Sequence, residues 1–157
     1  MSGEELIPWR KEYEEAEKAA LTDLLSKHLG PEYVSTRASG GGEILSYIEG
    51  WKMMNLANEV FGFNGWKSEI KSLSVDYIEE REGRVSLAVT STIRVVIRDG
   101  AYREDIGFGS ADNVRNKGQA LEKAKKEAIT DGIKRCFRQF GNLMGNCLYD
   151  KRYLQSV

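Results

Sequence analysis

The sequence predicts an α+β fold in which an antiparallel β-meander precedes a long helix and a packing helix lies near the N-terminus. Two observations carry this prediction. Apolar residues alternate with polar residues from Val85 to Ile97, which is typical of a strand with one buried face. A helical pattern from Gln119 to Gly145 then places apolar residues on one side and basic residues on another.

The other elements follow from periodicity and from the positions of glycine and proline. Gly30 and Pro31 end the first helical pattern, and Asp99-Gly100 is a strong hairpin signal after the central strand. In chain order, we expect a helix over Trp9 to Leu29, a short strand over Glu43 to Glu49 and a helix over Trp51 to Phe61. A strand over Lys67 to Glu80 should then precede the central strand. A third strand should follow it, since Tyr102, Ile106 and Phe108 continue the alternation.

Length and composition favour one soluble domain. The chain has 157 residues, of which 41% are hydrophobic, and this is enough for one good core, so we expect residues 1–157 to form a single domain. No run approaches the roughly 18 apolar residues of a membrane helix, and the N-terminus lacks the order of a signal peptide. Cys136 and Cys147 are the only cysteines and have no metal or redox spacing.

Charge is distributed unevenly, although the formal net charge is -1. Residues 1–34 carry eight acids against four bases, a balance of -4, whereas residues 110–138 carry eight bases against four acids, a balance of +4. This layout suits an anionic partner at one end, and it equally suits head-to-tail association of identical subunits. The residues alone leave both interpretations open.

The long helix concentrates its positive charge on one side. Lys134, Arg135 and Arg138 fall within an arc of roughly 100° on a helical wheel. Glu127 and Asp131 share that arc, so an ordinary solvated face with ion pairs stays an alternative. Arg138 has no acid one turn away along the sequence, which favours a ligand.

A second candidate surface lies near the Ser-Gly-Gly-Gly loop. Arg37 precedes this loop and Tyr47 follows it on the predicted short strand. Single-stranded nucleic acid needs such a combination, because phosphates bind cations and bases stack on aromatic rings. Tyr47 alone equally suits sheet packing. Arg84 and Arg115, beside the first turn and before the long helix, can extend the positive track.

The sequence does not predict an enzyme. It lacks a nucleotide-binding GxxxxGK[ST] motif, a Cys/His ligand set and a Ser/His arrangement, so no cofactor or metal is expected. The acids Glu104, Asp105 and Asp112 are the candidates for a magnesium nuclease. Glu104 and Asp105 are adjacent on a predicted strand and therefore point to opposite faces, which disfavours a shared metal.

Four runs of residues carry a resemblance that extends over most of the sequence. They are LGPEYVSTR at Leu29 to Arg37, YIEGWKMMNLANEVFGFNGW at Tyr47 to Trp66, YREDIGFG at Tyr102 to Gly109, and EKAKKEAITDGIKRCFRQFGNLMGNCLYDKRYL at Glu122 to Leu154. They resemble the single-strand-annealing domain of the eukaryotic Rad-fifty-two recombination mediators. Phe63 and Phe108 depart from this family's pattern, because tyrosine is common at both positions.

The resemblance implies a β-β-β-α core that assembles into a closed ring of identical subunits. It also implies that single-stranded DNA lies in a basic groove around the ring and is annealed without nucleotide hydrolysis. By resemblance, the inner groove is lined by Arg37, Tyr47, Lys126, Lys134, Arg135 and Arg138, and an outer DNA site by Arg84 and Arg115. Glu127 and Asp131 are then expected to hold the basic side chains in position.

The resemblance also sets expectations about partners. We expect a nuclear protein that acts in homologous recombination and double-strand break repair, with single-stranded DNA, duplex DNA at the outer site, and its own copies as partners. Family members continue into a tail that binds the recombinase and the single-strand-binding protein, whereas this sequence ends at Val157. Annealing is therefore expected to carry over, whereas the resemblance leaves recombinase loading open. The rival interpretation is a structural module whose basic helix docks on an acidic neighbouring subunit.

Overall fold

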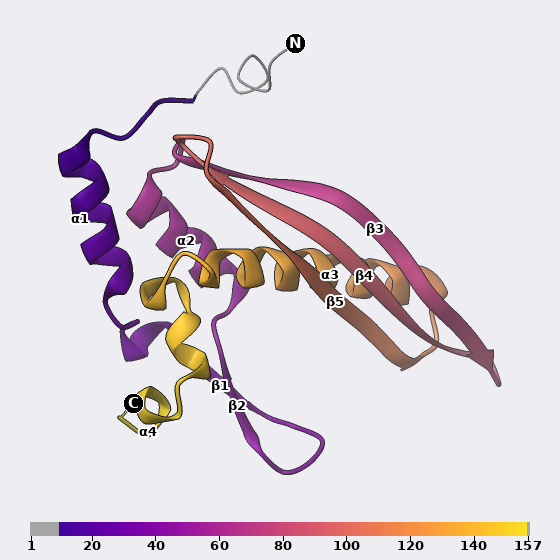
Figure 1. Ribbon diagram of the computed structural model, residues 1–157. Coiled ribbons are helices and arrows are strands. Elements are labelled where there is room, and N and C mark those ends of the chain that lie inside the picture. The colour runs from indigo at the N-terminus through magenta and orange to yellow at the C-terminus, as the bar shows by residue number, and fades with distance from the viewer. Residues whose placement is uncertain (1–9, 157) are drawn as a thin grey trace. The chain divides into compact units, whose positions relative to one another are not determined.

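A computed structural model describes residues 10–156 and confirms the predicted α+β fold. Trp9, the first residue of the first predicted helix, lies outside the described residues. In chain order the elements are α1 (Glu15–Ser26), η2 (Pro31–Tyr33), β1 (Ser35–Ala38), β2 (Ile44–Tyr47), α2 (Gly50–Phe61), β3 (Trp66–Arg81), β4 (Arg84–Ile97), β5 (Tyr102–Val114), α3 (Lys117–Arg138), η3 (Asn142–Met144), η4 (Asn146–Tyr149) and α4 (Lys151–Ser156) (Figure 1). None of the helices described is long and apolar enough to cross a membrane.

The chain forms two compact units, and each is described by itself. Unit 1 comprises Met1–Lys67, Val96–Tyr102 and Phe137–Val157, and unit 2 comprises Ser68–Val95 and Arg103–Cys136. Neither unit is a continuous stretch of sequence. The single domain over residues 1–157 stays a prediction.

The central strand β4 forms the core of unit 2 and confirms the predicted alternation. Val85, Leu87 and Val89 on one face are at most 5% exposed, while the residues between them are half-buried. The strands β3 and β5 flank β4 in one antiparallel sheet, so both are edge strands. β3 is exposed over most of its length.

On the third strand, β5, the large apolar side chains do not face the core. Ile106 and Phe108, which continue the predicted alternation, are 46% and 52% exposed. The buried positions belong to Gly107 and Gly109 instead, because α3 runs too close for any side chain. A Cβ atom on Gly109 would lie 1.9 Å from the carbonyl oxygen of Ala124.

Small residues on α3 complete this close approach between helix and sheet. Ala120, Ala124 and Ala128 are fully buried against the sheet. Ser91 interrupts the apolar face of β4, and its buried hydroxyl donates a hydrogen bond to the Ala128 carbonyl at 2.7 Å. This bond satisfies a polar group that would otherwise be costly to bury.

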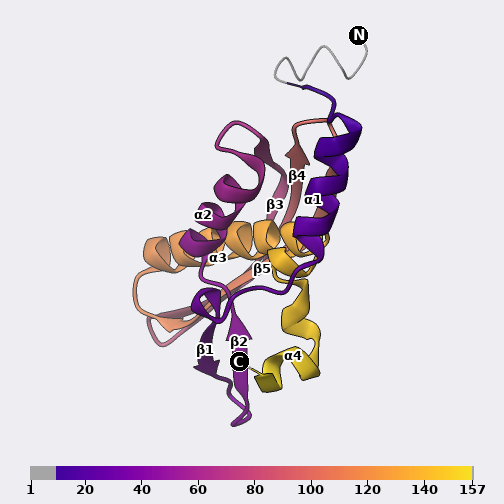
Figure 2. The ribbon, with the colours of Figure 1, turned by 90° about the vertical axis from the view of Figure 1, so that its left-hand side faces the viewer.

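Unit 1 contains a hairpin of which the sequence predicted only the second strand. β1 pairs antiparallel with β2, which places Ser35 opposite Tyr47 and Arg37 opposite Leu45. The two strands lie side by side in both views (Figures 1 and 2). A hydrogen bond from the Ser39 N–H to the Glu43 carbonyl, at 2.7 Å, closes the glycine-rich loop between the strands.

An aromatic cluster in unit 1 anchors the C-terminal end of α3. The ring of Phe137 lies 5.0 Å from that of Trp66 in an edge-on contact. Phe61, at the end of α2, contacts Phe140 at a ring distance of 5.6 Å. Phe137 is fully buried, so the backbone beside it, which carries Arg138, has a fixed position.

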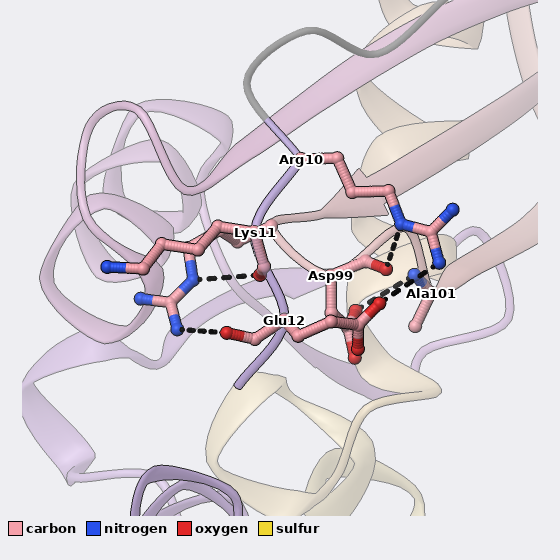
Figure 3. A network of polar contacts seen from close by, with 6 residues as sticks. Arg10, Lys11, Glu12, Asp99 and Ala101 are labelled. Carbon is pink, nitrogen blue, oxygen red and sulfur yellow. Dashed lines mark hydrogen bonds and ion pairs between the residues drawn. The ribbon is translucent and has the colours of Figure 1, made fainter. Parts of the chain in front are cut away.

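The N-terminal segment contacts the turn that joins β4 to β5, and this turn and the segment both belong to unit 1. Helix α1 begins at Glu15, later than predicted, because Glu14 and Glu17 form a capping box there. The extended residues before the helix contact the turn instead. Arg10 Nε donates to the Asp99 carbonyl at 2.9 Å, and the guanidinium of Arg98 donates to the Lys11 carbonyl at 3.2 Å (Figure 3).

The environment of Cys136 predicts low thiol reactivity. The side chain is fully buried, and burial is the main cause that raises the pKa of the thiol to about 11. Because the thiolate is the reactive form, native Cys136 should react at pH 8 roughly 100-fold more slowly than an unfolded thiol. Ellman's reagent on a Cys147→Ser variant measures this rate. Equal rates in native and urea-unfolded protein would contradict the burial.

Candidate nucleic-acid interface

The hairpin in unit 1 brings Arg37 and Tyr47 together. Their strand positions are diagonal across the antiparallel pair, so both side chains lie on one face. The Cζ atom of Arg37 lies 5.5 Å from the centroid of the Tyr47 ring, within the range of a cation-π contact. Arg37 is exposed and Tyr47 is half-buried. The hairpin therefore presents a cation supported by an aromatic ring.

Arg138, the last residue of α3, makes a second contact of this kind in unit 1. Its Cζ atom lies 4.8 Å from the centroid of the Tyr149 ring. Arg138 itself is half-buried. Tyr149 lies beyond the end of the helix, so a helical wheel cannot show this pairing.

Arg135 makes the third contact, in unit 2. Its Cζ atom lies 5.4 Å from the centroid of the Phe108 ring on β5, and its Nε atom pairs with Asp131 at 3.0 Å. Asp131 also accepts the backbone N–H of Phe108 at 2.9 Å. One carboxylate therefore contacts both the arginine and the strand that carries its aromatic partner.

The other acid expected to support the basic face has a different partner. Glu127 pairs with Lys123 at 3.3 Å, and Lys123 also donates to the Ser110 carbonyl at 2.8 Å. Lys126 is exposed and Lys134 is half-buried, both on α3 in unit 2. Glu127 therefore orders a lysine outside the predicted set.

Arg84 and Arg115, predicted for the outer site, both belong to unit 2. Arg84 Nη1 donates to the carbonyl of Asn113 at 2.9 Å, only two residues before Arg115. Arg115 is exposed, and Asn116 after it accepts the Gln119 N–H at 3.0 Å near the start of α3. Both arginines thus lie near the C-terminal end of β5.

The predicted residues are divided between the two units. Arg37, Tyr47 and Arg138 belong to unit 1, whereas Lys126, Lys134, Arg135, Arg84 and Arg115 belong to unit 2. Within unit 1 the structure brings Arg37 to Tyr47, and within unit 2 it brings Arg84 to the backbone of Asn113. A single inner groove that joins residues of both units stays a prediction.

The acids that a nuclease would use have other partners. Glu104 pairs with Arg94 at 2.8 Å, and Asp112 accepts a hydrogen bond from the Ser86 hydroxyl at 2.8 Å. Among residues 10–156, no group of three His, Cys, Asp or Glu side chains is arranged to hold a metal ion.

Comparison with known proteins gives a match over nearly the whole chain. The model of a family described as Rad52/22 family double-strand break repair protein matches residues 13–157. The chain belongs to this family. The resemblance seen in the four sequence runs is therefore confirmed.

Several curated members of the Rad52/22 family are similar to this chain. They include the DNA repair and recombination protein RAD52 of Eremothecium gossypii, 54% identical over 85% of this chain and 31% of its own length. Another is the DNA repair and recombination protein rad22 of Schizosaccharomyces pombe, 54% identical over 92% of this chain and 31% of its own length. The RAD52 protein of Saccharomyces cerevisiae is 51% identical over 85% of this chain. The chain thus spans about a third of the length of these relatives.

Two aromatic partners in the candidate interface escaped prediction from the sequence. Phe108 was named for the alternation of its strand and as a departure from the pattern of the Rad52/22 family, but not as a site residue, and Tyr149 was not singled out at all. The signal for Phe108 lies in the glycines on either side of it, because buried Gly107 and Gly109 force the ring between them to the exposed face. No comparable signal marks Tyr149.

Proposed function

We propose that this chain binds single-stranded DNA through the predicted basic residues and pairs complementary strands without nucleotide hydrolysis, in recombination and double-strand break repair. The supporting observation is that three of these residues each lie over an aromatic ring. They are Arg37 over Tyr47, Arg135 over Phe108, and Arg138 over Tyr149. Single-stranded DNA is bound by cations that neutralise phosphates and by rings that accept bases. Membership of a DNA repair family agrees with this use.

The mechanism that we propose is presentation of the bases. Arg37, Lys134, Arg135 and Arg138 neutralise phosphates of one strand, which releases counterions and makes binding sensitive to salt. Stacking on the face of a ring leaves the hydrogen-bonding edge of a base open to a second strand. The outer residues Arg84 and Arg115 capture that strand or a duplex.

We further propose that the subunits assemble into a ring. The edge strand β3 supports this proposal, because an exposed apolar edge is a template for pairing with another chain. The exposed apolar side chains on β3 are Ile70, Leu73, Val75, Tyr77 and Ile78. We propose a nuclear location, as repair of chromosomal DNA requires.

The experiment that tests this function measures binding of a fluorescent oligonucleotide by anisotropy at several salt concentrations. We expect affinity to fall steeply with salt, with a slope of about 0.7 per phosphate neutralised. Absence of binding at low salt would overturn the proposal. Incubation of the bound DNA with Mg²⁺ tests the nuclease alternative, for which strand cleavage is the expected result.

The position of Asp131 predicts that removal of an acid weakens DNA binding. Asp131→Ala frees the guanidinium of Arg135 and leaves the Phe108 N–H without its acceptor. We expect single-stranded DNA affinity to fall about two- to fivefold, despite the loss of a negative charge. Asp131→Asn keeps an acceptor for the Phe108 N–H but removes the negative charge, so it tests the ion pair with Arg135 apart from the hydrogen bond to Phe108. Tighter binding by Asp131→Ala would mean that the acid neutralises Arg135 and does not position it.

A further inference from the structure

Tyr149 is exposed because the chain on both sides of it is anchored in unit 1. Met144 and Cys147 before it are at most 1% exposed. Tyr153 after it is also buried, and its hydroxyl donates a hydrogen bond to the Leu29 carbonyl at 2.6 Å. Between these anchors, 69% of Tyr149 is exposed. The fold thus holds a large aromatic ring in solvent at a fixed place.

The ring of Tyr149 is paired with a residue of the proposed DNA interface. The guanidinium of Arg138 lies over it, with 4.8 Å between Cζ and the ring centroid. A cation over an aromatic ring is attracted by the negative charge of its face. Since most of the side chain stays exposed, the ring still has surface for a second planar group.

The carboxylate of the next residue, Asp150, pairs with groups at the start of α4. Asp150 accepts the backbone N–H of Arg152 at 2.9 Å, and the Arg152 guanidinium lies 3.6 Å from it. The backbone hydrogen bond is the main cause that lowers the pKa of Asp150, so the carboxylate is charged but already paired. Its charge is directed to the start of α4.

Two other exposed aromatic rings of unit 1 differ from Tyr149 in their surroundings. Lys52 Nζ lies 5.6 Å from the centroid of the Trp51 ring, but Trp51 also donates its indole N–H to the Glu49 carboxylate at 2.6 Å, and that negative charge repels a phosphate. Phe63 is 85% exposed, and no contact with a cation is found for it within the described residues. Tyr149 combines exposure, a fixed position and an arginine.

We propose that Tyr149 binds single-stranded DNA by stacking on a base, while Arg138 neutralises a neighbouring phosphate. This inference rests on the proposed function. Tyr149 is more exposed than Tyr47, which is half-buried, and is therefore the better platform for a base. The stacked base keeps its pairing edge free for the complementary strand.

The test compares an ordinary oligonucleotide with an abasic oligonucleotide of the same length and charge. Tyr149→Leu should weaken binding of the ordinary strand about fivefold or more and leave the abasic strand unaffected. Tyr149→Phe keeps the ring and should bind as the wild type does. Phe63→Leu is the matched control and should bind both strands normally.

Each outcome separates this inference from the proposed function. Equal weakening of both strands by Tyr149→Leu would mean that the ring only positions Arg138, and unchanged binding of both would remove it from the interface; either result overturns the inference. Absence of binding by the wild type would overturn the proposed function itself. Arg138→Ala should weaken both strands, which shows that the abasic strand reports phosphate contacts.

Discussion

Gly109→Ala should destabilise the protein by about 3 kcal/mol, at the upper end of the cost of overpacking. The new Cβ would lie 1.9 Å from the Ala124 carbonyl oxygen and 2.6 Å from the Ala128 backbone nitrogen. Both are backbone atoms of α3, so no side chain can move aside, and the helix has to leave the sheet. The midpoint of thermal unfolding should fall by roughly 6–12 °C.

A matched substitution separates this steric effect from a general effect of removing glycine. Gly40 lies in the hairpin loop of unit 1 with no atom within 4 Å of the position that a Cβ would take. Gly40→Ala should therefore leave the unfolding midpoint nearly unchanged. If both variants melt at the wild-type temperature, then α3 does not approach β5 as closely as described.

Removal of the two arginines of unit 1 from the proposed interface should have the largest effect on DNA binding. We expect Arg37→Ala combined with Arg138→Ala to weaken single-stranded DNA affinity at least tenfold. Because each arginine is proposed to neutralise one phosphate, the salt slope should fall by about 1.4. Anisotropy titrations at several salt concentrations measure both quantities.

A control for the loss of positive charge and a size measurement accompany this prediction. Lys27 is exposed beyond the end of α1, and Lys27→Ala removes a positive charge outside the proposed interface. It should change neither affinity nor slope. If the double variant instead dissociates into smaller species and keeps its DNA affinity, the rival function is supported. In that case the basic helix docks on a neighbouring subunit.

The fold was predictable from the sequence where burial follows side-chain type. The alternation from Val85 to Ile97 located β4, because its apolar side chains are the buried ones. The same type of pattern failed on β5, because α3 lies too close for side chains on that face. Gly107 and Gly109 therefore occupy the buried face, and Phe108 lies on the exposed face. β1 was missed, since four mostly exposed residues carry no periodic signal.

The sequence located the charges of the candidate site and one of its aromatic rings, Tyr47, but not the rings that contact Arg135 and Arg138. The sequence located Arg135 and Arg138 by helical spacing, and the structure adds what lies beneath each guanidinium. Phe108 and Tyr149 come from other elements, so their contacts depend on tertiary structure that no spacing along α3 can express. The ion pair between Asp131 and Arg135 could be expected from the sequence, because the two residues lie one turn apart on the same helix.

The most direct test of the account is annealing of two complementary oligonucleotides, followed by energy transfer between labels on the two strands. Light scattering on the same samples gives the size of the assembly. We predict that the wild-type protein accelerates pairing well beyond the spontaneous rate without nucleotide. The variant that combines Arg37→Ala with Arg138→Ala should lose this acceleration at unchanged size. Pairing at the spontaneous rate with wild-type protein, or full acceleration by the variant, would contradict the account.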